Sequence, residues 1–200
     1  LFEEHLESLR VARAKAIRWL DEHQRPDGGW SWRQESRSDY FITAYSLWAM
    51  ALLERSGSML DPNVLIHARS FVEQSLKGSD ADILQKTWML YALVLSNEVD
   101  SIKQKRPSRS EAKYFTTLWR HREVLKEEGL ALLALTAHHL GFDEEAALLI
   151  QDLKGKAHAP VLAQNEKDRQ EAFSETLVWG EDFKDSRWAQ GSVVATSFVL

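Results

Sequence analysis

The sequence predicts an all-α fold made of helical hairpins, with apolar helices in an inner layer and amphipathic helices in an outer layer. Apolar residues recur at helical spacing along most of the chain, and glycine and proline signals separate the segments. Charge-rich helices alternate with helices that are apolar nearly all round, and the latter must be covered on all faces. The matching pairs Trp48-Ala49, Tyr91-Ala92 and Leu133-Ala134 recur at spacings of 43 and then 42 residues, which indicates a helical repeat.

The first hairpin is the most clearly marked element. An amphipathic helix is expected at 3–23, and Pro26-Asp27-Gly28-Gly29 cannot continue it, because proline lacks an N–H and glycine accepts positive φ. Trp30 follows this turn directly and can fold back over the helix end. A more apolar helix is expected at 39–55, closed by Gly57.

The remaining elements follow from capping and breaking signals. Asp61-Pro62 predicts an N-cap with a first-turn proline, and Ser108 with Glu111 predicts a capping box. Residues 157–190 have weak periodicity, which indicates a long surface segment. The further helices are expected at 61–76, 81–96, 108–125, 127–140, 143–156 and from 191 to the last residue.

Composition limits the class of protein. A chain of 200 residues makes one domain, and its 25 basic against 30 acidic residues argue against a nucleic-acid binder. No apolar run approaches the roughly 20 residues of a membrane span. The absence of cysteine excludes disulfides, thiolate zinc sites and a cysteine nucleophile within these residues. Both ends interrupt a helical pattern, so we expect residues 1–200 to be one domain truncated from a larger multidomain protein.

Four tryptophans have two interpretations. Trp30 and Trp32 could line a ligand groove beside Trp179 and Trp188, which the repeat would place at a similar level. Anchoring in the turn or the core is favoured, since an aromatic ring at a tight turn covers a helix end and buries apolar area.

Other polar residues also have structural explanations. Gln24 is expected to bond backbone groups that the turn around Gly28 leaves free. His138 and His139 are adjacent, so on a helix they point in different directions and cannot share one metal ion. Carboxylates at the helix starts suit the macrodipole. We therefore predict no catalytic, cofactor-binding or metal-binding residue in the chain.

The repeat alone leaves two architectures open, a HEAT-like open solenoid and a closed ring of hairpins. The pattern Trp19-Leu20-x3-Gln24-x3-Gly28-x-Trp30 resembles the Gln-Trp motif of the α/α-toroid superfamily. That superfamily includes terpenoid cyclases, prenyltransferase β subunits and the thioester domains of alpha-2-macroglobulin and complement proteins. The resemblance favours the ring.

Within this superfamily the sequence is most similar to bacterial alpha-2-macroglobulin-like proteins. The similarity lies in Asp39-Tyr40-Phe41-Ile42-Thr43-Ala44-Tyr45 after the turn, in 122–135, in Leu140-Gly141, and in Trp179-Gly180 followed by Trp188. The fold it implies is an α/α toroid with inner and outer helix layers. About four hairpins are visible where a full toroid has six, so a partial ring is expected.

The resemblance implies a non-catalytic module of a protease inhibitor that traps proteases outside the cell or in the periplasm. Its partners would be proteases and neighbouring domains of the parent chain, with no cofactor, nucleic acid or membrane insertion. The family's thioester uses a Cys-x-Glu-Gln motif, which would lie N-terminal to this segment or be lost.

Two alternatives stay open. A toroid enzyme related to terpenoid cyclases or polysaccharide lyases is the first, although Asp39 is all that remains here of an Asp-rich acid motif. An α-solenoid interaction scaffold is the second.

Overall fold

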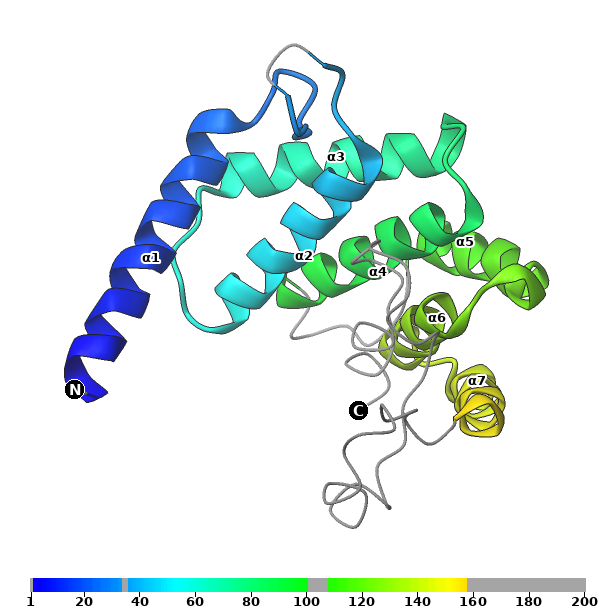
Figure 1. The fold of residues 1–200 in the computed structure, drawn as a ribbon. Helices are drawn as coiled ribbons and strands as arrows, with labels where there is room; N and C mark the ends of the chain where they lie inside the picture. Colours follow the sequence, from blue (N-terminus) through cyan, green and yellow to red (C-terminus); the bar gives the residue numbers. More distant parts are fainter. Residues whose placement is uncertain (1, 34–35, 101–107, 158–200) are drawn as a thin grey trace, which may run out of the picture. The chain divides into compact units, whose positions relative to one another are not determined.

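The computed structural model describes residues 2–33, 36–100 and 108–157 (Figure 1). The chain divides into two compact units, Leu1–Gln104 and Lys105–Leu200. Every regular element in the described ranges is helical. Three predictions lie outside these ranges: the helix expected from residue 191, and the groove positions of Trp179 and Trp188. Nearly all of the surface segment predicted at 157–190 also lies outside them.

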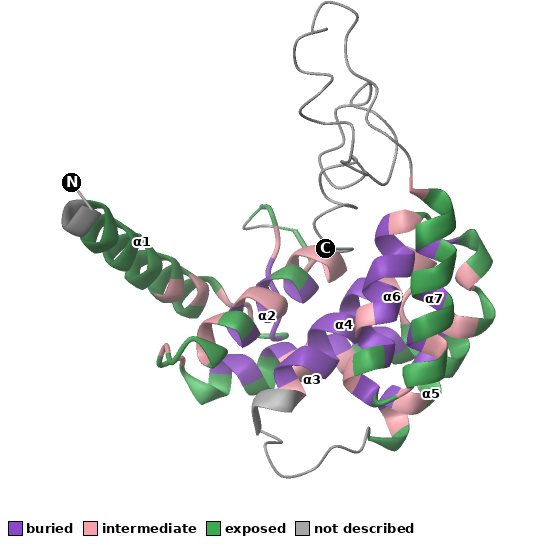
Figure 2. Ribbon diagram, turned by 90° about the horizontal axis from the view of Figure 1, so that it is seen from below, coloured by how far each residue is buried: buried purple, intermediate pink, exposed green. Residues whose placement is uncertain are grey.

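The first unit contains four helices, and its core lies between the second and the fourth. Its elements are α1 (Phe2–His23), α2 (Tyr40–Arg55), α3 (Pro62–Gly78) and α4 (Ile83–Asp100). Helices α2 and α4 pack side by side, and α3 packs against both (Figure 1). Leu47 and Met50 of α2 and Met89 and Leu90 of α4 are at most 1% exposed. In contrast, α1 is exposed along most of its length (Figure 2).

Local capping explains where these helices begin and end. The Asp39 carboxylate accepts a hydrogen bond from the Ile42 N–H, and the Asp61 carboxylate accepts one from the Asn63 N–H. Pro62 occupies the first turn of α3, and Gly57 takes a φ of 79° just after α2. The predicted N-cap at Asp61, the first-turn Pro62 and the closing Gly57 are confirmed, although α4 extends four residues beyond its predicted end at 96.

The second unit is built around one apolar helix. Its elements are α5 (Arg109–Arg120), the 3-10 helix η1 (Arg122–Val124), α6 (Glu127–Leu140) and α7 (Asp143–Lys156). Both α5 and α7 pack against α6. Ser108 and Glu111 form the predicted capping box, and Gly141 ends α6 with a φ of 75°.

The prediction of one continuous helix over 108–125 was wrong at its end. The α-helix stops at Arg120, and η1 follows as a separate turn. The His121 Nδ1 donates to the Thr117 carbonyl at 2.9 Å, and the Arg122 Nη1 donates to the Trp119 carbonyl at 2.9 Å. These side chains occupy carbonyls that a continued helix would have bonded with its own N–H groups, so the helix ends there.

The all-α fold is confirmed for the described residues, and helices that are buried on most faces alternate with helices that bury one face. The apolar helices α2, α4 and α6 carry most of the buried residues, while α3, α5 and α7 each bury one face (Figure 2). The contacting hairpins agree with the predicted α/α toroid; of the fourth predicted hairpin, the described residues contain α7. None of the described helices combines the length and the hydropathy needed to cross a bilayer.

One detail of the layer prediction needs correction. The expectation that an apolar inner helix is covered on all faces does not hold for α2, since Tyr45 is 40% and Leu52 is 42% exposed. Both side chains lie away from the side of α2 that carries the buried Leu47 and Met50.

Candidate functional site

The turn between α1 and α2, which we call the Gln-Trp turn (residues 24–30), has its own backbone framework. The Gly28 N–H donates to the Arg25 carbonyl at 2.9 Å, and the Arg25 N–H donates to the Gly29 carbonyl at 3.0 Å. The Asp27 carboxylate accepts from the Gly29 N–H at 3.1 Å and from the Ser38 hydroxyl at 2.7 Å. The turn is therefore closed on itself and also tied to the chain that leads into α2.

Gln24 joins this turn to α3. Its Nε2 donates to the Gly28 carbonyl at 3.0 Å and to the Val64 carbonyl at 2.8 Å. Val64 lies in the first turn of α3, forty residues further along the chain. Both acceptors are backbone groups, so the Gln24 amide acts as a structural bridge between two segments.

Trp30 joins α1 to α2 and is buried, with 1% of its surface exposed. Its indole Nε1 donates to the Leu20 carbonyl near the end of α1 at 3.1 Å. Its backbone N–H donates to the Thr43 hydroxyl at 3.0 Å, and its carbonyl accepts from the Asp39 N–H at 2.8 Å. The ring and the backbone of Trp30 thus fix the start of α2 against the end of α1.

Two glycines allow this close approach. Gly28 has a φ of +89°, and a Cβ placed on it would lie 2.3 Å from the carbonyl oxygen of His67 in α3. A Cβ on Gly29 would lie 2.5 Å from the Ser38 Cβ and 2.9 Å from the Thr43 hydroxyl oxygen. No side chain fits at either position without displacement, so the double glycine lets α3 and the entry to α2 pack onto the turn.

The structure describes two tryptophans of the predicted groove, Trp30 and Trp32, and places them in different surroundings. Trp32 is 73% exposed, whereas Trp30 is 1% exposed. Trp19, the first residue of the motif, is 50% exposed and stacks on His23 with ring centroids 4.5 Å apart. With Trp179 and Trp188 outside the described residues, the four-tryptophan groove stays a prediction, whereas Gln24, Gly28 and Trp30 lie together in one turn.

An aromatic cluster links the two central helices of the first unit. Trp88 of α4 lies 5.7 Å from Phe41, 6.1 Å from Tyr45 and 6.0 Å from Trp48, measured between ring centroids. These centroid distances fall in the range of attractive aromatic pairs. We did not predict this cluster, although positions 41, 45 and 48 have the spacing of one helix face.

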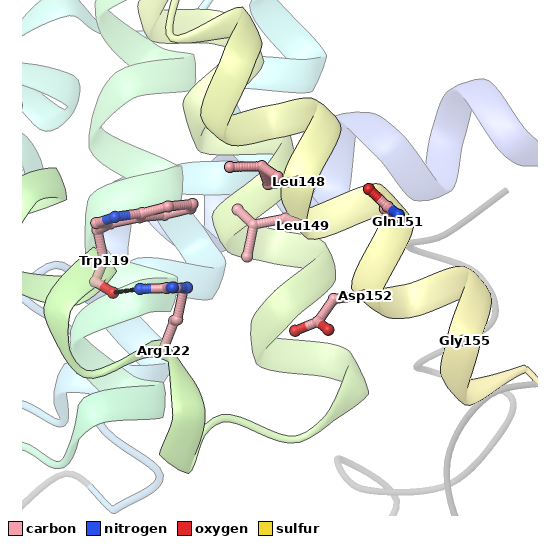
Figure 3. A pocket seen from close by; sticks show the side chains of 7 residues that line it. All are labelled: Trp119, Arg122, Leu148, Leu149, Gln151, Asp152 and Gly155. Carbon is pink, nitrogen blue, oxygen red and sulfur yellow. Dashed lines mark hydrogen bonds between the residues drawn. The ribbon is translucent and has the colours of Figure 1, made fainter.

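The second unit contains a pocket of about 390 Å³ that we did not predict from the sequence (Figure 3). One wall comes from the end of α5 and from η1, and the other comes from α7. Its lining includes Trp119, Arg122, Leu148, Leu149, Asp152 and Gly155. The residues of the two walls are about thirty positions apart in the sequence, so neither segment alone signals a site.

One wall of the pocket is a stacked pair. The Arg122 Cζ lies 4.2 Å from the centroid of the Trp119 ring, which is a cation–π contact. The Arg122 Nη1 also donates to the Trp119 carbonyl. On the α7 wall Leu149 is 1% exposed and Leu148 is 56% exposed (Figure 3).

The pKa values of two groups in the first unit are shifted by their surroundings. Partial desolvation, and then the negative charges of Asp61 and Glu22, raise the pKa of Asp21 above its ordinary value. Partial desolvation and the hydrogen bond from its hydroxyl to the Asp80 carboxylate, at 3.1 Å, raise the pKa of Tyr40. The described residues include no group of three or more His, Cys, Asp or Glu side chains placed to hold a metal ion.

Comparison with known proteins finds this fold in Escherichia coli alpha-2-macroglobulin. The native protein, in a structure spanning domain MG7 to the C-terminus, matches with a TM-score of 0.55 and 19% identity, over 72% of this chain and 24% of that chain. The trypsin-activated protein matches with a TM-score of 0.50 and 19% identity, over 68% of this chain and 10% of that chain. No protein-family model and no curated protein matches the sequence. The chain therefore has a fold that occurs in the C-terminal region of a bacterial alpha-2-macroglobulin, as its resemblance to that family predicted.

Proposed function

We propose that this chain is the helical thioester-type domain of an alpha-2-macroglobulin-like protease inhibitor. In this proposal it is a packing and presentation module and performs no catalysis. Its partners are proteases and the neighbouring domains of its parent, and it acts outside the cell or in the periplasm.

The observation that carries the proposal is the match in fold to Escherichia coli alpha-2-macroglobulin. A region with this arrangement of helices is present in that protein both in its native form and after activation by trypsin. A domain kept through such activation is suited to presenting a surface to a captured protease, which is the role proposed here.

The Gln-Trp turn supports a structural role for the part of the chain that most resembles the family. The polar atoms of Gln24, Asp27 and Thr43 bond backbone or hydroxyl groups of the same unit. The Trp30 indole is fully inside the unit, and its N–H bonds a backbone carbonyl. Side chains used in this way hold α1, α2 and α3 together and are not presented to a substrate.

The covalent chemistry of the family needs a cysteine, and the 200 residues contain none. A thioester, if the parent has one, would involve residues of the parent outside this segment. In the proposal, this domain would then supply the surface on which the reactive group is held until bait cleavage releases it.

Retention of a protease by the native parent protein tests the proposal. The protein purified from its source is mixed with active trypsin, or with trypsin whose active-site serine has been blocked, and each mixture is separated by size. We expect active trypsin to elute with the large protein and blocked trypsin to elute alone, because the blocked enzyme cannot cut a bait segment. Failure to retain any of several active proteases would overturn the proposal, and turnover of an isoprenoid or uronate substrate would favour a toroid enzyme.

A further inference from the structure

We propose that the pocket between α5, η1 and α7 binds an extended peptide segment of a protein partner. One peptide group of that segment lies between Arg122 and Asp152, and an adjacent apolar side chain packs on Trp119 and Leu148. The inference rests on the second unit alone and does not depend on protease trapping.

The guanidinium of Arg122 is already held in place. Stacking on the Trp119 ring and one hydrogen bond to the Trp119 carbonyl fix its plane. A guanidinium carries five N–H donors, so donors remain for a ligand. An arginine held on a tryptophan loses little side-chain freedom on binding, and both residue types are enriched among those that dominate binding energy at protein interfaces.

Asp152 supplies the opposite charge from the facing wall (Figure 3). Within the described parts of the chain, it makes no ion pair or hydrogen bond with Arg122 or with any other residue. It also lies near the C-terminal end of α7, where the helix dipole disfavours a negative charge. The stability of α7 therefore does not explain why a carboxylate stands at this position. A role as acceptor for an N–H group of a ligand does explain it.

The opposite charges of Arg122 and Asp152 on facing walls favour a dipolar ligand group over a simple ion. A simple anion drawn to Arg122 would meet the Asp152 carboxylate, and a simple cation drawn to Asp152 would meet the guanidinium. A peptide group satisfies both, because its carbonyl accepts from Arg122 and its N–H donates to Asp152. Since Leu148 is exposed and the Trp119 ring is half-buried, an apolar side chain next to that peptide group would find an apolar surface.

Gly155 keeps one end of the pocket open. A Cβ placed on it would meet no atom within 4 Å, so no packing or strain requires glycine here. Glycine inside a helix is less favourable than alanine, because it loses more backbone freedom on folding. The pocket, with Gly155 in its lining, has a volume of about 390 Å³, which falls within the range of ligand-binding pockets.

Peptide titration followed by NMR tests the inference on the full chain. The probe is the capped peptide acetyl-Gly-Leu-Gly-amide, and the signal is the Trp119 indole N–H, assigned with the variant Trp119→Phe. We expect a saturable shift of this signal at millimolar peptide. Sodium acetate and methylammonium chloride at the same concentrations should give no saturable shift. An absent shift with the peptide, or equal binding of either simple ion, would overturn the proposal.

Three variants complete the test. Asp152→Asn keeps the shape but weakens the acceptor, so we expect about tenfold weaker peptide binding. Gly155→Leu fills the open end and should abolish the shift, while the far-ultraviolet circular dichroism stays unchanged. Glu144→Gln is the matched control, because it removes one negative charge from an exposed position of α7 outside the pocket. This variant should bind the peptide like the wild type. Wild-type affinity in both Asp152→Asn and Gly155→Leu would place the peptide elsewhere and refute the inference.

Discussion

Replacing Gly28 by alanine should destabilise the first unit much more than the same change at another positive-φ glycine. Gly28 has a φ of +89°, and an ideal Cβ built on it would lie 2.3 Å from the His67 carbonyl oxygen and 2.8 Å from its carbonyl carbon. These atoms belong to the backbone of α3, so they cannot move aside as the end of a flexible side chain could. The turn or α3 must shift instead.

Two terms set the magnitude. An alanine held in the left-handed region costs about 1–2 kcal/mol. Overpacking against fixed atoms adds about 1–3 kcal/mol, part of which comes from strain on the Gln24 bonds to Gly28 and Val64. We therefore expect Gly28→Ala to lower the free energy of unfolding by about 2–5 kcal/mol.

Gly57→Ala is the matched control in the same unit. Gly57 has a φ of +79°, but a Cβ on it would meet no atom within 4 Å, so only the conformational cost applies. Urea unfolding of the full chain, followed by circular dichroism, gives both free energies. The excess loss of about 1–3 kcal/mol in Gly28→Ala over Gly57→Ala isolates the clash with α3. Equal losses in the two variants would refute the close packing of this turn on α3.

Three further predictions concern the same unit and use the same unfolding assay. Gln24→Ala leaves two backbone carbonyls without their amide donor and should cost about 1–3 kcal/mol; a loss below the error of the assay would contradict the bridging role. Trp30→Phe keeps an aromatic ring but loses the indole N–H, so it should cost about 1–3 kcal/mol, against about 3–5 kcal/mol for Trp30→Ala, and no measurable loss in Trp30→Phe would show that the hydrogen bond to Leu20 is unimportant. The pKa of Asp21 is raised in the folded chain, so its ionisation opposes folding and stability is lost as pH rises through the carboxyl range. Asp21→Asn should therefore be more stable than the wild type at pH 7 and similar to it near about pH 3, and a gain at both pH values would rule out this electrostatic cause.

The helices could be predicted from the sequence because their signals are local. Asp39, Asp61 and Ser108 cap helices through hydrogen bonds to N–H groups two or three residues away, so the sequence around each one is sufficient. The apolar character of α4 and α6 likewise follows from composition within one helix. The failure at the end of α5 has a different origin, since helix periodicity does not reveal that the Arg122 side chain returns to the Trp119 carbonyl.

The candidate sites were only partly predictable, because they depend on contacts between distant segments. The motif indicated that Gln24 bonds the backbone near the turn, but its second acceptor, Val64, could be found only once α3 was placed. The pocket of the second unit needed the packing of α5 and α7 on α6 to bring Arg122 and Asp152 to facing walls. Each of these two residues, taken alone, has the pattern of an ordinary surface charge.

The intact mass of the native protein from its source, with and without methylamine, tests the central claim most directly. The proposed function predicts a protein many times larger than the 23.0 kDa of this chain. A gain of one amine adduct would then reveal a reactive thioester elsewhere in that protein, and no gain would mean trapping without covalent capture. A native protein no larger than this chain would contradict the assignment to an alpha-2-macroglobulin-like inhibitor.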